Sequence, residues 1–329
     1  MCSAAHAPER SAWTISKDPK DKEVPCRIRK HFSVSHFKPD EGILIVPVIL
    51  GGGIGSRLWP VSQETVPKQF IPLIDERSTF QETLLRVSNT DIFEPPLVIT
   101  HTDFRFVVSE QLRSIGIPAD ILLEPVRRDS AAAIVAATLV AGKRDRKAII
   151  LVLPSDHAIA DVSRFLEVCR EAASVARCGY ITTFGVRPDR PSTGYGYLRQ
   201  GTRISGANAR LVAEFIEKPD LDTARKFVDS GYLWNSGNLM FRADVMLSEF
   251  RRYMPELTDA VENSIENAEH DADFIRLCDK SFALAPRISI DHAIMEKTSM
   301  AAVIPADIGW SDVGSWESVW MVSDKDGNG

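Results

Sequence analysis

Five short apolar segments alternate with amphipathic stretches between residue 43 and about residue 185. The apolar segments are Ile43–Leu50, Leu97–Thr100, Asp120–Leu123, Ala148–Leu153 and Tyr180–Gly185. Helical patterns lie between them, near Thr79–Asn89, Phe104–Ser114, Ser130–Lys143 and Ser163–Arg177. The first apolar run is almost unbroken, which is typical of a strand buried on both faces of a sheet. The alternation predicts an α/β fold that is Rossmann-like, with a doubly wound, mostly parallel sheet.

The pattern becomes less regular after about Gly185. Short strands are expected near Tyr195–Arg199, Leu211–Glu217 and Asn238–Phe241, and helices near Leu221–Ser230, Arg242–Tyr253 and Leu257–Ala268. We interpret residues 185–300 as an inserted part that covers the edge of the sheet and forms the pocket of a second substrate. A last strand is predicted near Ala301–Pro305. Residues 1–42 show no periodicity, so we expect a flexible N-terminal extension before a domain of residues 43–329.

Composition and charge exclude some classes of function. The net charge of -6 and the pI near 5.7 argue against a general nucleic-acid binder. The sequence has no uninterrupted apolar run of the roughly 18 residues that a membrane span needs, and residues 1–42 lack an apolar signal core. The five cysteines show no paired metal spacing. We therefore expect a cytoplasmic protein without membrane or nucleic-acid partners, and a homo-oligomer stays an open alternative.

A glycine-rich turn directly follows the first apolar segment. Its candidate nucleotide-binding residues are Gly51, Gly52, Gly53, Gly55 and Ser56. Without a Cβ, such a turn lets backbone N–H groups approach phosphate oxygens closely. The glycines alone also fit a plain structural turn, since they match the dinucleotide motif only in part and lack the Gly-Lys-Ser/Thr ending of a P-loop. Arg57 and Lys68 add the positive charge that a polyphosphate requires, and we expect both to be catalytic.

Two carboxylates are candidate ligands of a hard cation. Asp156 follows a buried apolar run and Pro154, at the end of a strand where ligands bind in such sheets. A helix cap is the alternative role for Asp156. Asp312 lies in a turn rich in Gly and Trp and is the natural second ligand. If the two meet in space, one Mg²⁺ could bridge them to triphosphate oxygens.

Three further segments carry polar groups suited to a sugar phosphate. Glu217 and Lys218 end a predicted strand, where the acid suits a sugar hydroxyl and the base a phosphate; a solvated ion pair is the alternative. Asn235 stands before Ser236-Gly237, and an ordinary Asn turn is the alternative there. Gly196 lies between two tyrosines and could equally be a simple strand start.

Together these segments resemble the sugar-1-phosphate nucleotidylyltransferase family, and within it the bacterial long-form mannose-1-phosphate guanylyltransferases, or GDP-mannose pyrophosphorylases. The resemblance runs from about Ile43 to Gly329. It rests on the segments Gly-Gly-Gly-Ile-Gly-Ser-Arg-Leu-Trp-Pro (51–60), Pro-Lys-Gln-Phe (67–70), Leu-Pro-Ser-Asp-His (153–157), Phe-Ile-Glu-Lys-Pro (215–219), Trp-Asn-Ser-Gly (234–237) and Gly-Trp-Ser-Asp-Val-Gly-Ser-Trp (309–316).

The resemblance implies a nucleotide-diphospho-sugar transferase type of fold and the Mg²⁺-dependent reaction of GTP with mannose 1-phosphate, which gives GDP-mannose and pyrophosphate. It implies that residues 185–300 are the sugar-binding part. By motif, Arg57 would hold the β- and γ-phosphates, and Lys68 would hold the reacting phosphates. Asp156 and Asp312 would bind the Mg²⁺. The mannose would be bound by Glu217, Asn235 and the Gly196 backbone, and its phosphate by Lys218. Glu124 is the candidate that accepts hydrogen bonds from guanine.

This sequence departs from the family pattern in places. In the loop that the resemblance places beside the base, Arg127, Asp129, Ser130 and Ala132 replace the family's Gly, Asn, Thr and Pro. The isomerase domain that many relatives carry is not expected in this chain. Two other functions stay open: a nucleotidylyltransferase for another hexose 1-phosphate, and an inactive regulatory homologue that binds nucleotide sugars.

Overall fold

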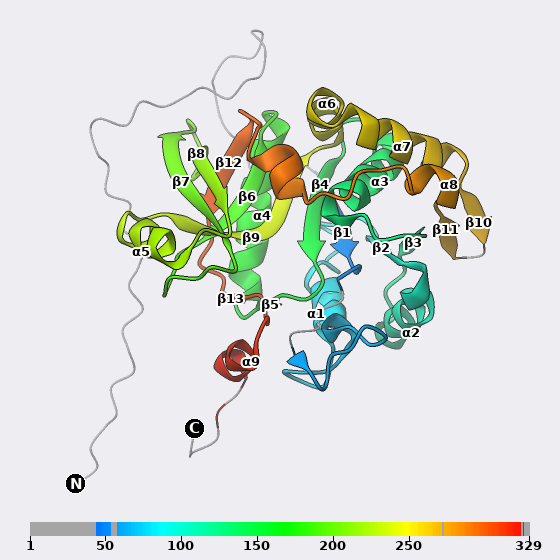
Figure 1. Cartoon of the computed structure of the whole chain (residues 1–329), viewed down its shortest axis with the longest axis horizontal. Helices are drawn as coiled ribbons and strands as arrows, with labels where there is room; N and C mark the ends of the chain where they lie inside the picture. The colour runs from blue at the N-terminus through cyan, green and yellow to red at the C-terminus, as the bar shows by residue number, and fades with distance from the viewer. Residues whose placement is uncertain (1–43, 54–57, 272, 324, 326–329) are drawn as a thin grey trace.

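The computed structural model describes residues 44–53, 58–271, 273–323 and 325. The predicted extension of residues 1–42 lies outside the described residues, as do Gly55, Ser56 and Arg57. Within the described residues, eleven strands form one sheet in the order β10-β11-β3-β2-β1-β4-β9-β6-β12-β8-β7 (Figure 1). These strands are β1 (Ile45–Leu50), β2 (Leu97–His101), β3 (Asp120–Glu124), β4 (Ile149–Pro154), β6 (Ile181–Val186), β7 (Gly196–Arg203), β8 (Arg210–Glu217), β9 (Leu233–Arg242), β10 (Glu269–Asp271), β11 (Phe274–Arg276) and β12 (Ala301–Pro305).

Strand β1 shows why its sequence is apolar throughout. Side chains alternate between the two faces of a strand. Accordingly, Val46 and Val48 belong to one hydrophobic core, while Ile45 and Ile49 belong to a second core on the opposite face. The strand pairs in parallel with β2 on one side and β4 on the other. It therefore lies in the interior of the sheet, and its carboxyl end opens at Gly51.

Helices cover both faces of the sheet. The first core includes residues of α3 (Asp129–Arg144), α6 (Ala243–Tyr253), α7 (Pro255–Glu266) and α8 (Asp279–Phe282). The second includes residues of α1 (Thr79–Arg86), α2 (Arg105–Ile115) and α4 (Val162–Arg177). This two-sided arrangement confirms the predicted α/β fold with helices on both sides of the sheet.

The second half of the chain enters the sheet more deeply than we expected. Strands β7 and β8 form one edge, with α5 (Leu221–Asp229) beside them (Figure 1). Strand β9, by contrast, lies in the middle of the sheet, antiparallel to both β4 and β6. The expectation that this part only covers the sheet edge is therefore wrong for β9, and the sheet is mixed. We missed the first half of β9 because Asn235 and Gly237 are typical turn residues.

Short elements complete the side of the sheet where β1 and β4 end. Strands β5 (Ala158–Ile159) and β13 (Trp310–Ser311) pair antiparallel with each other, and α9 (Trp316–Val322) follows close by (Figure 1). The structure also contains the 3-10 helices Lys68–Phe70 and Thr102–Phe104 and the π-helix Asp291–Met295. Among the described residues, no helix has the length and apolar character to cross a membrane.

Candidate active site

The glycine turn at the end of β1 is held by hydrogen bonds to residues outside the turn. The Gly51 N–H donates to the Ile99 carbonyl at 2.8 Å, and the Thr100 hydroxyl donates to the Gly51 carbonyl at 3.0 Å. The Gln69 amide donates to the Gly53 carbonyl at 2.7 Å. A Cβ added at Gly53 would meet no atom within 4 Å. Among the described residues, the space beside Gly53 is therefore open, while Gly51 and Gly52 lie against Thr100 and Glu124.

Lys68 connects the end of β4 with the segment that follows β13. Its buried ammonium donates to the backbone carbonyls of Asp312 at 2.6 Å and Val313 at 3.0 Å, and lies 3.1 Å from Asp156 Oδ2. Val313 adopts a left-handed backbone with φ 46°, which is unusual for a β-branched residue and is typical of functional sites. Three contacts use all three N–H groups of a lysine ammonium. Lys68 therefore brings Asp156 and Asp312 to one site.

Asp156 is kept ionised at this site. Burial disfavours its charged form, but the Lys68 ammonium outweighs burial, so the pKa of Asp156 lies below its ordinary value. The Trp310 indole donates to His157 Nδ1 at 3.1 Å, and His157 Nε2 lies 3.6 Å from Asp156 Oδ1. Burial lowers the pKa of His157. A neutral imidazole therefore lies between Trp310 and Asp156.

The Asp312 carboxylate is oriented by two donors. The Tyr195 hydroxyl donates to Asp312 Oδ1 at 2.8 Å, and the Gly314 N–H donates to the same oxygen at 3.2 Å. Burial, and then the Asp312 charge, raise the pKa of Tyr195, so the phenol stays protonated and keeps donating. Among the described residues, no group of three or more His, Cys, Asp and Glu side chains gathers around a possible metal position. A pair of carboxylates nevertheless suits Mg²⁺, which binds proteins through one or two carboxylates and takes its other ligands from phosphates and water.

Gly196 and Glu217 form the core of a second polar group. They are paired residues of β7 and β8, and a Cβ at position 196 would lie 2.6 Å from Glu217 Oε2. Only glycine therefore leaves the carboxylate where it is. Lys218 has a left-handed backbone with φ 48°, and its ammonium lies 2.6 Å from Glu217 Oε1. The ion pair given as the alternative thus exists, but the Glu217 side chain is only 11% exposed while that of Lys218 is 62% exposed.

Asn235 joins this polar group to a residue that we did not predict. Its Oδ1 accepts from the Thr183 hydroxyl at 2.7 Å, and its Nδ2 donates to Asp291 Oδ1 at 3.1 Å. Burial, and then the nearby Glu217 carboxylate, raise the pKa of Asp291 to about 6. Two acids and an amide therefore face one region beside Gly196. Such a set of hydrogen-bond acceptors and donors is suited to a ligand rich in hydroxyls.

Glu124 lies on the other side of the glycine turn, at the end of β3. A Cβ at Gly52 would lie 3.4 Å from Glu124 Oε2, and the Oε1 atom is buried without a hydrogen-bond partner among the described residues. Burial, and then the charge of Asp129, raise the pKa of Glu124 to about 8, while Arg127 partly offsets them. A buried carboxyl group with an unused oxygen is costly unless a ligand completes its hydrogen bonds.

The family of this chain follows from its sequence and agrees with this geometry. Residues 46–329 match the family described as nucleotidyl transferase. The chain belongs to that nucleotidyl transferase family. A xanthan biosynthesis protein, XanB of Xanthomonas campestris pv. campestris (strain B100), is 47% identical over 287 residues, which are 87% of this chain and 61% of that protein. A mannose-1-phosphate guanylyltransferase of Sinorhizobium fredii is 46% identical over 288 residues, 87% of this chain and 56% of the relative.

A solved structure extends the comparison. A Thermus thermophilus protein described as a mannose-1-phosphate geranyltransferase superposes with a TM-score of 0.75 at 32% identity, and the match covers 86% of this chain and 80% of that one. The chain spans about three fifths of the length of the curated relatives it matches.

The structure gathers most of the predicted site residues of this nucleotidyl transferase. Two sets emerge, one around the glycine turn and one around the edge strands. The first contains Gly51, Gly52, Gly53, Lys68, Glu124, Asp156 and Asp312, and the second Gly196, Glu217, Lys218 and Asn235. Asp156 does not cap a helix, because Asp161 caps α4. Asn235 lies within β9, and its Oδ1 also accepts from the Gly237 N–H at 3.2 Å, the local bond of an Asn turn.

Sequence reasoning missed the residues that orient the others. Asp291, Tyr195 and Gln69 each hold a predicted site residue through a side-chain hydrogen bond. Gln69 lies in the segment that we selected for Lys68, and Tyr195 lies next to Gly196. Asp291 begins a π-helix, an element that is frequent at functional sites but has no sequence signal that we used.

Proposed function

We propose that this chain transfers GMP from GTP to mannose 1-phosphate, giving GDP-mannose and pyrophosphate. The observation that carries the proposal is the position of Lys68, whose ammonium joins Asp156 to the Asp312 region, while the adjacent Gln69 holds the glycine turn. The names of the two curated relatives support the choice of reaction and its place in polysaccharide biosynthesis. Both substrates are assigned to this chain as part of the proposal.

In the proposed reaction, a phosphate oxygen of mannose 1-phosphate attacks the α-phosphorus of GTP. The bond from that phosphorus to the bridging oxygen of the β-phosphate breaks, and pyrophosphate leaves with the electron pair. Within the described residues we find no need for a protein nucleophile, because the two substrates react directly. Lys68 stabilises the extra negative charge on the reacting phosphate. Since its three N–H groups are already used, one contact must be exchanged for a phosphate oxygen in the substrate complex.

We assign Mg²⁺ to Asp156 and Asp312. Asp156 is ionised and 32% exposed, and the Asp312 carboxylate is fixed by Tyr195 and Gly314. When bound, the metal would supply charge neutralisation for the triphosphate. Lys68 holds the two aspartates at one site before any substrate arrives, and this reduces the reorganisation needed on binding.

The two remaining polar groups divide the recognition of substrates. We assign Glu217, Asn235 and Asp291, with the Gly196 backbone, to the mannose hydroxyls, and Lys218 to the sugar phosphate. We assign Glu124 to guanine, because its unused Oε1 could accept hydrogen bonds from guanine N1–H and N2–H₂, which adenine lacks.

The test is an assay of pyrophosphate release with purified protein, Mg²⁺, mannose 1-phosphate and each nucleoside triphosphate in turn. We expect release with GTP at a rate at least tenfold above that with ATP, UTP or dTTP. Release of pyrophosphate only with UTP or dTTP would show that the chain is a nucleotidylyltransferase with another nucleotide specificity. No release with any pair of nucleotide and hexose 1-phosphate would favour the regulatory homologue.

A further inference from the structure

A second cavity lies beside the candidate active site and has no role in the proposed reaction. Its volume is about 690 Å³, within the range of small-molecule sites. Its walls come from α1, β5, β13 and α9, and from Arg190, Tyr195 and Trp234. The lining is predominantly apolar. The described residues that hold the glycine turn and the mannose-side carboxylates do not line it.

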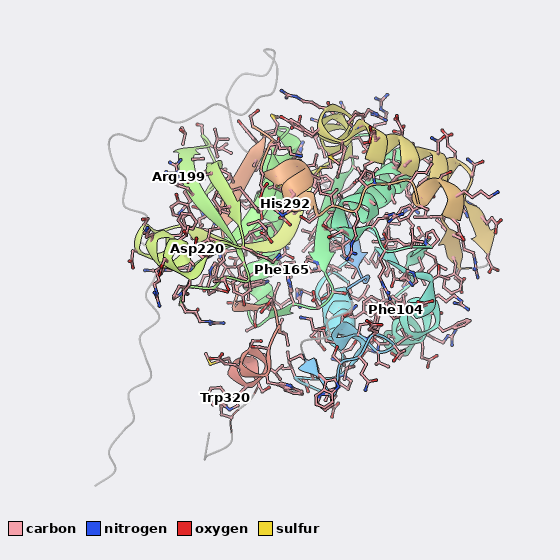
Figure 2. All side chains as sticks on the ribbon, viewed as in Figure 1. Phe104, Phe165, Arg199, Asp220, His292 and Trp320 are labelled. Carbon is pink, nitrogen blue, oxygen red and sulfur yellow. The ribbon has the colours of Figure 1, made fainter. Side chains whose placement is uncertain are left out.

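A buried cation lines this cavity. Arg86, in the last turn of α1, is only 7% exposed, and its guanidinium lies over the ring of Phe165 at 5.6 Å from the centroid. Phe165 lies in the interior of the molecule (Figure 2). The Nε atom of Arg86 is buried without a hydrogen-bond partner, and no carboxylate among the described residues lies within ion-pair distance of the side chain. Burial lowers the pKa of Arg86 to about 10, so the side chain remains a cation at neutral pH.

The two other arginines that line the cavity are paired with carboxylates. Arg77 lies 3.4 Å from Glu82, and Arg190 lies 3.0 Å from Asp189. Among the described lining residues, Arg86 is therefore the arginine without an ion pair, although the Glu82 charge partly offsets its burial and Asp75 also lines the cavity. Trp234 lines the same cavity, and its indole N–H is also buried without a partner in the described part of the chain. Two unused buried donors and an apolar wall are suited to an acceptor-rich anionic group on an apolar body.

The wall of this cavity separates it from the catalytic carboxylates. His157 and Trp310 line the cavity, while their neighbour Asp156 contacts Lys68. Tyr195 also lines it, and its hydroxyl holds Asp312. A ligand in the cavity would thus contact the residues that orient both aspartates without contacting Lys68.

We propose that this cavity is a second binding site, for a small organic anion whose phosphate or carboxylate group pairs with Arg86 and whose apolar body packs against the lining. The proposal is independent of which sugar nucleotide the chain makes. It explains why a buried guanidinium is kept without a carboxylate partner, an arrangement that is otherwise unfavourable.

Calorimetric titration of the whole chain tests the proposal, with phenyl phosphate, benzoate and neutral phenol as probes. We expect one of the two anions to bind with a Kd below about 1 mM, and phenol to bind at least tenfold more weakly, because only the anions pair with a guanidinium. Arg86→Met should weaken anion binding at least tenfold. The matched control is Arg113→Met. Arg113 is an exposed residue of α2 that pairs with Glu110, so this variant should bind the anions like the unchanged chain.

Met321 supplies a variant that does not disturb the buried region. It lines the cavity from α9 and is 57% exposed. Figure 2 shows α9, with Trp320, at the periphery of the molecule, so charges are tolerated there. Met321→Lys should tighten anion binding and Met321→Glu should weaken it, each by about two- to fivefold. The proposal would be overturned if all these variants bound the anions equally well. It would also be overturned if inorganic pyrophosphate displaced the bound anion and Arg86→Met left anion binding unchanged.

Discussion

Gly196 and Glu217 face each other across β7 and β8 so closely that a Cβ at position 196 would lie 2.6 Å from Glu217 Oε2. The same Cβ would lie 3.2 Å from Phe215 Cζ. The end of a glutamate side chain can move aside, so the fold could tolerate the change. The carboxylate, however, would leave the position from which it faces Asn235 and Asp291. A change at this pair should therefore affect the proposed sugar site more than the fold.

Gly196→Ala is therefore expected to damage the use of mannose 1-phosphate more than the fold. We expect kcat/KM for mannose 1-phosphate to fall roughly tenfold to a hundredfold, because displacing a positioning group by about 1 Å has effects of this size. The KM for GTP and the melting temperature should change little. Gly194→Ala is the matched control, since its Cβ would meet only Ser192 Oγ, at 3.6 Å. Equal kinetics of the two variants would remove Glu217 from the sugar site.

Asp291→Asn should change how stability depends on pH. The folded-state pKa of Asp291 is about 6, above the unfolded value of about 3.9, so the folded state binds more protons between these values. Its contribution to stability is therefore present below about pH 4 and is lost as the pH rises through 6. An amide does not ionise, so the Asn variant does not lose stability in this way as the pH rises. The stability of the Asp291→Asn variant relative to the parent should therefore be greater at pH 7 than at pH 4, by up to about 3 kcal/mol.

Urea unfolding of the Asp291→Asn variant and of the parent, at pH 4 and at pH 7, measures this change. The matched control is Asp222→Asn, at an exposed position, which should show no such dependence. The prediction would be contradicted if the variant and the parent differed in stability by the same amount at both pH values.

The sequence was most informative where local pattern and burial agree. The apolar run of β1 and the helical patterns of α1 to α4 predicted their elements to within a few residues, because burial on both faces or one face leaves a regular signal. The glycine turn, Lys68, Asp156 and Asp312 followed from position at strand ends and from the family resemblance.

The missed features depend on partners distant in sequence. Strand β9 joins the middle of the sheet through pairing with β4 and β6, which outweighs the turn preference of Asn235 and Gly237. Asp291 gains its role from contact with Asn235, 56 positions away. Neither relation leaves a local pattern, so periodicity and spacing could not indicate it.

Glu124→Gln tests base recognition together with its pH dependence. Since the pKa of Glu124 is about 8, about a tenth of the free protein carries the carboxylate at pH 7. If guanine binds the ionised form, the KM for GTP should fall about tenfold between pH 7 and pH 9, while the KM for mannose 1-phosphate serves as the internal control. The Gln variant should lose this pH dependence and much of the preference for GTP over ATP. Steady-state kinetics across this pH range would decide, and a parallel pH profile in both proteins would exclude Glu124 as the base-reading group.

Asp312→Ala should reduce turnover far more than binding. If the carboxylate holds a metal that stabilises the transition state, kcat should fall by about a hundredfold or more, while the affinity for GTP changes only a few-fold. Tyr195→Phe removes the hydroxyl that donates to Asp312 Oδ1 but keeps the carboxylate, so its kcat should fall only about tenfold. Asp312→Asn keeps an acceptor for Tyr195 and should be as inactive as the Ala variant if charge, not position, is required. Turnover by Asp312→Ala within a few-fold of the parent would show that this aspartate does not act on the metal.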